Sequence, residues 1–371
     1  MEKQKQSRRL LSLDTLRGFD MFFIMGGSGL LAALATWFPC SFTEAIAEQM
    51  GHVSWHGLAH HDTIFPLFLF IAGISFPFSL AKQRSQGKSR SDIYRKIIFR
   101  GVALVVLGFI YNGLLNFEFE HFRFASVLAR IGLGWMFAAL LFISFKTITR
   151  VVIAAAILVG YWLFMMYVPV PGAVEGPLTY EGNWIGYIDC MIFPEHLLSP
   201  GKFDPEGVFS TIPAIVTAML GMFTGEFIKW NKRGFTDSRK VLWLVAAGIV
   251  LLVVGLLWAQ IFPLNKKLWT SSFVCVVGAY SVLMFALFYY IIDVLHWQRW
   301  TLFFKVIGLN SITIYLAQRF INFSYTGKKI FGGLVSLTPE NAQPFVESLG
   351  YIAVCWIFLY ILYRKRIFLK V

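Results

Sequence analysis

Residues 63–81 read TIFPLFLFIAGISFPFSLA and contain no charged side chain. A helix needs about 20 mostly apolar residues to cross a bilayer, so this run predicts a membrane span. Its flanks differ in charge: residues 51–62, GHVSWHGLAHHD, have four histidines and no Lys or Arg, whereas residues 82–90, KQRSQGKSR, have four basic side chains. Because Lys and Arg collect on the cytoplasmic side of membrane proteins, the basic flank is predicted to face inward.

Similar apolar runs recur along the chain of 371 residues, of which 57% are hydrophobic and 14% are charged. Soluble proteins have roughly 25% charged residues, so a soluble protein is excluded. We predict an all-α bundle with about ten transmembrane helices, forming one domain over residues 1–371 in the lipid bilayer. The predicted spans are 19–38, 63–81, 97–116, 125–145, 151–168, 208–228, 241–262, 271–292, 302–320 and 345–363. The shorter stretch 330–337 is predicted to be re-entrant or interfacial.

The distribution of basic residues tests this topology. With both termini in the cytoplasm, 25 of the 33 Lys and Arg fall in inner segments and seven fall in outer ones. The net charge of +13 therefore reflects orientation, and no nucleic-acid partner is expected. The four cysteines lack metal-ligand spacing. Cys40 and Cys190 lie in predicted outer loops, and a disulfide between them is left open.

Two groups of polar residues lie next to the predicted spans. In SLDTLRG, residues 12–18, Asp14 and Arg17 are three apart and can pair on one helix face. The alternative is a helix start in which Ser12 is the cap. In residues 51–66 the four histidines include no HExxH motif, so no metal is expected. Proton transfer by a histidine is the preferred interpretation, and interfacial side chains are the alternative.

Two further groups lie in a predicted outer loop and in the ninth span. The loop contains the polar residues Asn183, Asp189, Asp204 and Glu206, followed by Ser210 and Thr211. A loop ordered by helix caps is the alternative to a binding site there. Asn310 and Ser311 lie in an apolar helix, where their polar groups need partners. Hydrogen bonds between helices are the alternative to a functional role at this place.

Several motifs follow one another in a characteristic order. They are SLDTLRG at 12–18, HVSWHGL at 52–58, DTIFPLFLFIAGIS at 62–75, VLARIGLG at 127–134, GYIDCMIF at 186–193, FDPEGVFSTIPAIV at 203–216 and GLNSITIYL at 308–316. In combination they resemble the heparan-α-glucosaminide N-acetyltransferase family of membrane acyltransferases, over nearly the whole chain. The large lysosomal members carry an extra luminal domain and an extra first span. The resemblance is therefore to the bacterial form, and it implies the inner membrane.

The resemblance implies transfer of an acetyl group from cytoplasmic acetyl-CoA to the amino group of glucosamine or a related sugar on the periplasmic side. It implies that His52 is catalytic, and we expect Asp62 to orient His52 or to bind the sugar amine. From residue type we expect the co-substrate acetyl-CoA to contact Arg17, Arg84, Arg100, Asn310 and Ser311. Either Asn310 or Asn183 is expected to donate a hydrogen bond to the thioester oxyanion. The expected acceptor-binding residues are Asp14, Asn183, Asp189, Asp204 and Glu206.

A transporter for an amino sugar or a cell-wall fragment is the alternative function, because polar residues within spans suit it equally. A purely structural membrane protein does not explain those residues. A homodimer is left open.

Overall fold

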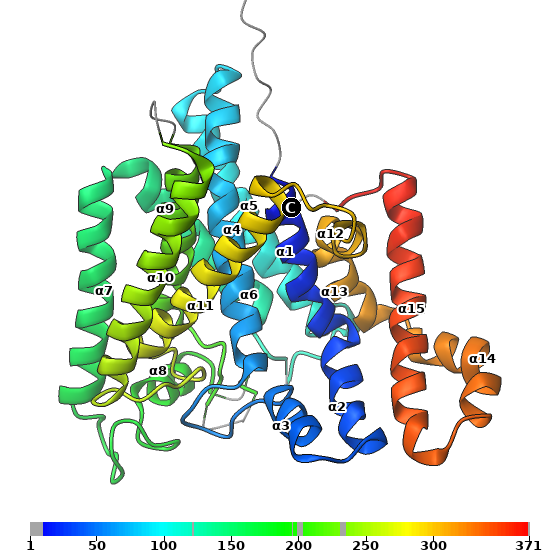
Figure 1. Ribbon diagram of the computed structural model, residues 1–371. Coiled ribbons are helices and arrows are strands. Elements are labelled where there is room, and N and C mark those ends of the chain that lie inside the picture. Colours follow the sequence, from blue (N-terminus) through cyan, green and yellow to red (C-terminus); the bar gives the residue numbers. More distant parts are fainter. Residues whose placement is uncertain (1–9, 121, 195, 199–202, 231–234, 370–371) are drawn as a thin grey trace, which may run out of the picture.

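The computed structural model describes residues 10–120, 122–194, 196–198, 203–230 and 235–369. Within these ranges the elements are all helical, and the long helices stand side by side in a bundle (Figure 1). Eight helices are long and apolar enough to cross a membrane. They are α1 with η1 and α2 (Leu11–Trp37), α4 (His60–Ser85), α6 (Val127–Ser144), α7 (Thr147–Tyr167), α9 (Thr211–Lys229), α10 (Asp237–Ala259), α11 with η3 (Ser271–Val294), and η4 with α15 (Glu340–Arg364).

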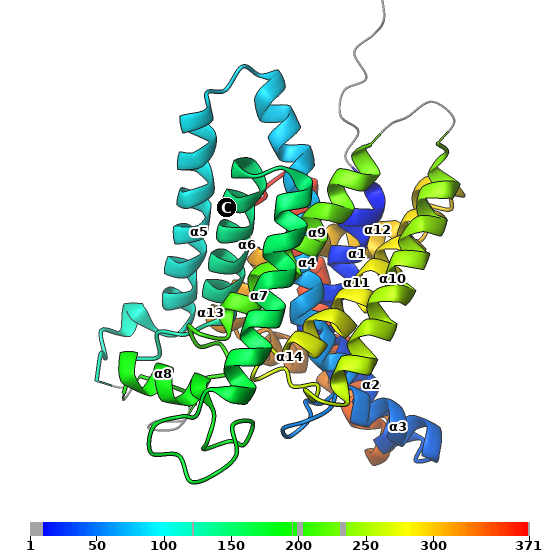
Figure 2. The same ribbon diagram turned by 90° about the vertical axis from the view of Figure 1, so that its left-hand side faces the viewer.

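Two further segments bring the bundle towards the predicted ten spans. Helices α12 (Thr301–Leu309) and α13 (Ser311–Phe320) together qualify as one span, bent by 68° at Asn310. Helix α5 (Arg90–Tyr111) has 22 residues, but Arg95, Lys96 and Arg100 lower its hydropathy. It stands beside α6 in the bundle (Figure 2), and this position favours a tenth span.

The shorter helices gather at one end of the bundle (Figure 1). They are α3 (Ser41–Gln49), η2 (Leu114–Asn116), α8 (Trp184–Ile192) and α14 (Phe323–Ser336). The predicted interfacial stretch 330–337 forms the second half of α14, which is too short to span a membrane. We call this end, which also includes residues 50–59, the histidine end.

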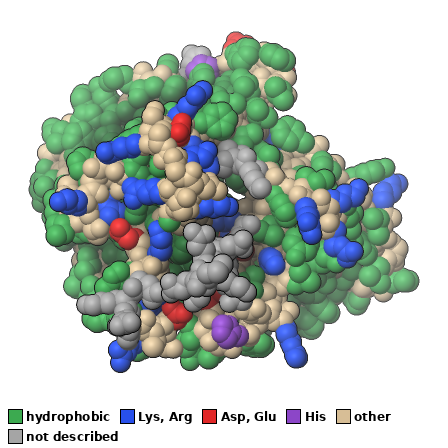
Figure 3. Space-filling view, turned by 90° about the horizontal axis from the view of Figure 1, so that it is seen from above, with side chains coloured by type: hydrophobic (Ala, Val, Ile, Leu, Met, Phe, Trp, Pro, Cys, Tyr) green, Lys and Arg blue, Asp and Glu red, His purple; other side chains and the backbone are tan. Residues whose placement is uncertain are grey.

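The opposite end of the bundle is rich in Lys and Arg (Figure 3). It contains the α4–α5 and α6–α7 connections, with the basic residues Lys82, Arg84, Lys88, Arg90 and Lys146. We call it the basic end. That the basic end faces the cytoplasm stays a prediction from the charge distribution.

The first span begins at Leu11, eight residues earlier than predicted. The motif SLDTLRG is therefore part of the helix rather than its entry. Ser12 does not cap this helix: the N-cap position is Leu10, and the Ser12 N–H donates to Asp293 Oδ2 at 3.2 Å. The same helix contains a π-helical turn, Phe23–Gly27, in which Gly26 has a φ of 130°. Only glycine adopts that conformation at little cost, so Gly26 permits the irregular turn.

Helix α4 is held in the centre of the bundle by close contact with α9. A Cβ atom added at Gly73 would lie 2.3 Å from the Ala218 carbonyl oxygen, and one at Gly221 would lie 2.0 Å from that of Phe70. Small residues allow helix backbones to approach in this way within a membrane. The packing fixes α4, whose first turn carries the candidate site.

We expect Gly221→Val to destabilise the protein strongly, because its side chain would collide with the α4 backbone. Overpacking usually costs about 1–3 kcal/mol, and a collision with backbone belongs at the upper limit of that range. The control is Gly160→Val on α7, where an added Cβ meets no atom within 4 Å. Thermal unfolding in detergent should show a large loss for Gly221→Val alone, and equal melting temperatures would contradict the packing argument.

The topology has a natural reporter at the histidine end. All four cysteines are free, so Cys40 and Cys190 are not paired, and Cys40 is exposed. A hydrogen bond from the Thr43 hydroxyl lowers the pKa of the Cys40 thiol, which favours the reactive thiolate. We expect a membrane-impermeant maleimide to label intact cells, and Cys40→Ser to remove most of the label. Labelling of Cys40 only after permeabilisation would invert the predicted orientation.

Candidate active site

A histidine and an aspartate form the centre of the site at the histidine end. His52 precedes α4 and Asp62 lies in its first turn, and His52 Nδ1 is 2.7 Å from Asp62 Oδ1. The Asp62 side chain is 1% exposed and that of His52 is 53% exposed. The other carboxylate oxygen accepts from the backbone N–H groups of Ala59, at 3.2 Å, and Val53, at 3.4 Å. With Nδ1 donating to this fixed carboxylate, His52 presents Nε2 as its basic nitrogen.

Lys266 lies beside both His52 and Asp62, and sequence analysis did not identify it as a site residue. It comes from the loop between α10 and α11, and its Nζ lies 3.3 Å from Asp62 Oδ1 and 3.2 Å from His52 Nδ1. Burial lowers the pKa of Lys266, and the carboxylates of Asp62 and Glu206 oppose this effect. The available signal was an unusual basic pair, Lys266 and Lys267, in a segment predicted to face outward.

The other histidines of this segment have different surroundings. The His61 ring lies 4.6 Å from the His52 ring, and its Nδ1 is 2.9 Å from Ser28 Oγ. His60 Nε2 lies 3.2 Å from the hydroxyl of Tyr280 on α11. His56 is exposed and lies 3.4 Å from an Asn265 side-chain nitrogen. The interpretation as an interfacial side chain therefore suits His56 and does not suit His60 or His61.

Two of the residues predicted to bind the acceptor, Asp204 and Glu206, already form ion pairs with Arg123. Arg123 donates to both oxygens of the buried Asp204, at 2.8 and 2.7 Å, and also contacts Glu206. Asp204 accepts two backbone N–H groups as well, those of Leu198 and Glu206. Asp204 is therefore a structural link in the loop rather than a free carboxylate. Glu206 retains some exposure, and its charge affects Lys266.

Asn183 and Ser210 also serve the loop structure. The Asn183 amide caps α8, accepting from the Gly186 N–H at 2.9 Å, and it donates to two backbone carbonyls at 2.9 Å. Both of its N–H donors are thus used, which argues against Asn183 as an oxyanion donor. The Ser210 hydroxyl contacts the buried guanidinium of Arg130 and does not cap α9.

Asp189 is fully buried below the same loop. One oxygen accepts from the Val208 N–H at 2.9 Å, and the other has no hydrogen-bond partner among the described residues. Gly207 leaves the room for it, since a Cβ there would lie 1.5 Å from Asp189 Oδ2. Burial raises the pKa of Asp189 to about 7. A carboxyl with this pKa is only partly ionised near neutral pH, and its full burial makes it poorly suited to bind a cationic amine.

The three arginines predicted to bind the co-substrate lie in two places. Arg17 forms the expected ion pair with Asp14, at 3.7 Å, and donates to Ser75 Oγ at 3.0 Å. Arg100 stacks on the Trp135 ring with its guanidinium carbon 4.3 Å from the centroid. Arg84 lies apart from them in a cavity of about 470 Å³ at the basic end. The basic residues that line this cavity are Arg84, Lys88, Arg90 and Lys146.

Asn310 and Ser311 lie at the bend between α12 and α13. The Asn310 amide donates to the Ile367 carbonyl at 3.2 Å. Ser311 lines a small apolar cavity of about 40 Å³ inside the bundle, together with Phe65 and Tyr315. Since Phe65 follows Asp62 by about one helical turn, this cavity lies about one turn of α4 deeper in the bundle than Asp62.

Asp14 lies apart from the other residues that are predicted to bind the acceptor. It lies 14 residues before Ser28 in the first span, which corresponds to roughly 20 Å along a helix. Ser28 contacts the His52 segment through His61, so Asp14 belongs to the basic end. One small sugar cannot contact both groups.

The fold and these two ends define a polytopic helical membrane protein with a histidine–aspartate pair at one end and basic side chains at the other. No protein-family model matches the chain. It is 27% identical to the human heparan-alpha-glucosaminide N-acetyltransferase, over 98% of the chain and 60% of that protein. The mouse protein of the same name is 25% identical, over 100% of the chain and 61% of its own length. The resemblance to this family is thereby confirmed, although the chain spans only about 60% of these relatives.

The raised pKa of Asp189 predicts a pH dependence of stability. Between its ordinary value of 3.8 and about 7, the folded state keeps a proton that the unfolded state has lost. The contribution of Asp189 to stability therefore falls as the pH rises through this range. We expect Asp189→Asn, which is neutral at every pH, to raise the melting temperature at pH 8 relative to wild type and to leave it nearly unchanged at pH 4. A constant difference at both pH values would show that Asp189 does not titrate there.

Proposed function

We propose that this protein transfers an acetyl group from acetyl-CoA, bound from the basic end, to the amino group of glucosamine or a related amino sugar at the histidine end. The observation that carries the proposal is the His52–Asp62 pair, whose buried carboxylate orients an exposed imidazole. The family resemblance supplies the reaction class. The cytoplasmic position of the basic end and the bacterial inner membrane are parts of the same proposal.

The proposed reaction needs a base, because a protonated amine cannot attack a thioester. Nε2 of His52 accepts a proton from the amine of the acceptor sugar, while the amine nitrogen forms a bond to the acetyl carbon. The carbon–sulfur bond then breaks, and the CoA thiolate takes up a proton. His61 stands beside His52, with Nδ1 held by Ser28, and is placed to exchange that proton. Covalent relay through an acetyl-imidazole on His52 is the alternative order of events.

Geometry separates the predicted phosphate-binding residues. Arg84 follows Asp62 by 22 residues on α4, which is roughly 33 Å along the helix. Arg17 precedes Ser28 by 11 residues, which is about half that distance. Arg100 lies at a similar depth to Arg17, because it stacks on Trp135, which donates to the Ala72 carbonyl about one turn of α4 from Ser75. Arg17 and Arg100 are therefore better placed to bind CoA phosphates while the thioester reaches His52. The cavity around Arg84 suits the entry of the anionic co-substrate.

The acceptor amine is proposed to bind near Glu206. Of the carboxylates in the loop, Asp204 is saturated by hydrogen bonds and Asp189 is buried. Glu206 remains partly exposed and lies close enough to Lys266 to affect its charge. An acidic side chain there would attract a cationic amino sugar.

We expect His52→Ala to lower acetyl transfer to a glucosamine acceptor by about 10²–10⁴-fold, mainly in kcat, because that range is typical of a lost general base. Binding of acetyl-CoA and the melting temperature should change little, since His52 is exposed and Asp62 keeps Lys266 and two backbone N–H groups as partners. His56→Ala is the matched control, because His56 is a histidine of the same segment without contact to Asp62. Near-normal turnover by His52→Ala would place the base elsewhere. Uptake of the sugar without acetylation by wild type would favour the transporter.

We expect Arg100→Gln to raise the KM for acetyl-CoA by about tenfold, which corresponds to loss of one charge-assisted hydrogen bond. The KM for the acceptor should stay the same. Arg90→Gln, in the wall of the cavity around Arg84, is the comparison. A larger rise in KM for Arg90→Gln than for Arg100→Gln would move the phosphate site to that cavity.

A further inference from the structure

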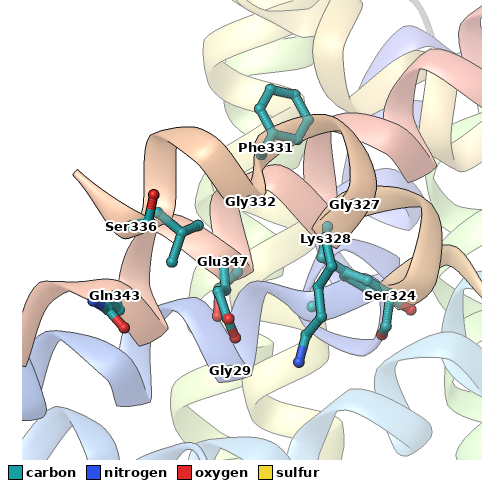
Figure 4. Close-up of a pocket in the computed structure, with 13 residues that line it drawn as sticks. Gly29, Ser324, Gly327, Lys328, Phe331, Gly332, Ser336, Gln343 and Glu347 are labelled. Atoms are coloured by element: carbon teal, nitrogen blue, oxygen red, sulfur yellow. The ribbon is translucent and has the colours of Figure 1, made fainter. Parts of the chain in front are cut away.

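A separate cavity of about 580 Å³ lies between the start of α2, α14 and α15 (Figure 4). None of the residues that line it belongs to the His52 site. Its wall includes Gly26, Gly29, Lys328, Gly332, Glu347 and Tyr351. No function discussed so far uses this cavity.

Two opposite charges reach into the cavity. Lys328 comes from α14 and Glu347 from α15, and their charged ends point to the same side, towards Gly29 (Figure 4). Within the part of the chain that the structure describes, no ion pair within 4.0 Å involves either side chain. Ser324 and Gln343 add further hydrogen-bonding groups to the wall. The cavity therefore suits a ligand that carries both an anion and a cation.

Glycines leave the cavity open. A Cβ atom added at Gly29 or at Gly332 would meet no other atom within 4 Å. A larger residue at either position would occupy the cavity without displacing the surrounding helices. Both positions can therefore be used to block it.

Exposed apolar side chains lie on α14 and at the residue after it, in a stripe beside the residues that line this cavity. Ile330, Leu334 and Leu337 are between 54% and 84% exposed, and Tyr325 is also exposed. Such a short helix, apolar on one side and basic at Lys328 and Lys329, is typical of the membrane interface. A polar cavity with both charges, bordered by an apolar surface, matches the two parts of a phospholipid.

We propose that this cavity binds the headgroup of a phospholipid of the phosphatidylethanolamine type. Lys328 binds the phosphate, Glu347 accepts hydrogen bonds from the primary ammonium, and the acyl chains lie along the apolar side of α14. An anionic headgroup without an amine would place a negative charge opposite the Glu347 carboxylate and offer it no ammonium group. A choline headgroup has no N–H donor for Glu347. The charge pair thus favours ethanolamine over both.

The test compares two neighbouring glycines. We expect the purified wild-type protein in detergent to be stabilised by phosphatidylethanolamine, and less by phosphatidylglycerol or phosphatidylcholine with the same acyl chains. Gly332→Leu should weaken the binding of phosphatidylethanolamine by at least about tenfold, as a lost headgroup contact would. Gly333→Leu, one residue further on α14 and also without neighbours within 4 Å, should leave it unchanged. Equal effects of both variants would overturn the proposal.

Two further measurements distinguish a phospholipid from a water-soluble ligand with the same headgroup and test the role of Lys328. Soluble glycerophosphoethanolamine should stabilise the protein far less than the lipid, and equal stabilisation would show a water-soluble ligand instead. Lys328→Glu should abolish the preference for phosphatidylethanolamine, whereas Lys329→Glu on the same helix should keep it, because Lys329 does not line the cavity. Equal binding of all three lipids by wild type would also overturn the proposal.

Discussion

The carboxylate of Asp62 holds the histidine end together. It accepts two backbone N–H groups from residues 53 and 59, binds His52, and pairs with Lys266 from a loop 204 residues further along the chain. A buried carboxylate requires such partners, because an unpaired charge is costly away from water. The same contacts order the segment before α4 and bring the α10–α11 loop to it. The geometry of His52 is therefore a consequence of satisfying Asp62, which α4 and its packing on α9 hold in place.

Some Lys and Arg residues lie on the predicted outer side, against the positive-inside rule, and their contacts show what they do there. Among residues predicted to face outward, Lys266 pairs with Asp62 and Arg123 pairs with Asp204 and Glu206. Lys267 donates to the Ser54 carbonyl at 2.6 Å and lies over the Trp55 ring. Orientation does not require a basic residue on this side, and these three have specific partners within the protein. Their contacts mark places where the histidine end is built.

Sequence analysis predicted the spans and the face on which the histidines lie, because these depend on local composition. The pairing of His52 with Asp62 was also anticipated, since only ten residues separate them. Lys266, Arg123 and the contact between Ser28 and His61 were missed, because each depends on segments brought together by helix packing. The early start of the first span was missed for a related reason. Its first turn contains Ser12, whose backbone N–H donates to Asp293 of η3, and a hydropathy pattern does not report such a partner.

The irregular turn at Phe23–Gly27 connects the two sites of the histidine end. It is followed directly by Ser28, whose hydroxyl contacts His61, and Gly26 and Gly29 on either side of Ser28 line the cavity beside α14. In a regular α-helix each residue advances by about 100°, and the π-helical turn adds one residue. The residues after the turn therefore face other directions than they would in an uninterrupted α-helix. The positive φ of Gly26 thus has a structural purpose. It allows one stretch of backbone to present the Ser28 hydroxyl to His61 on one side and glycines to the cavity beside α14 on the other.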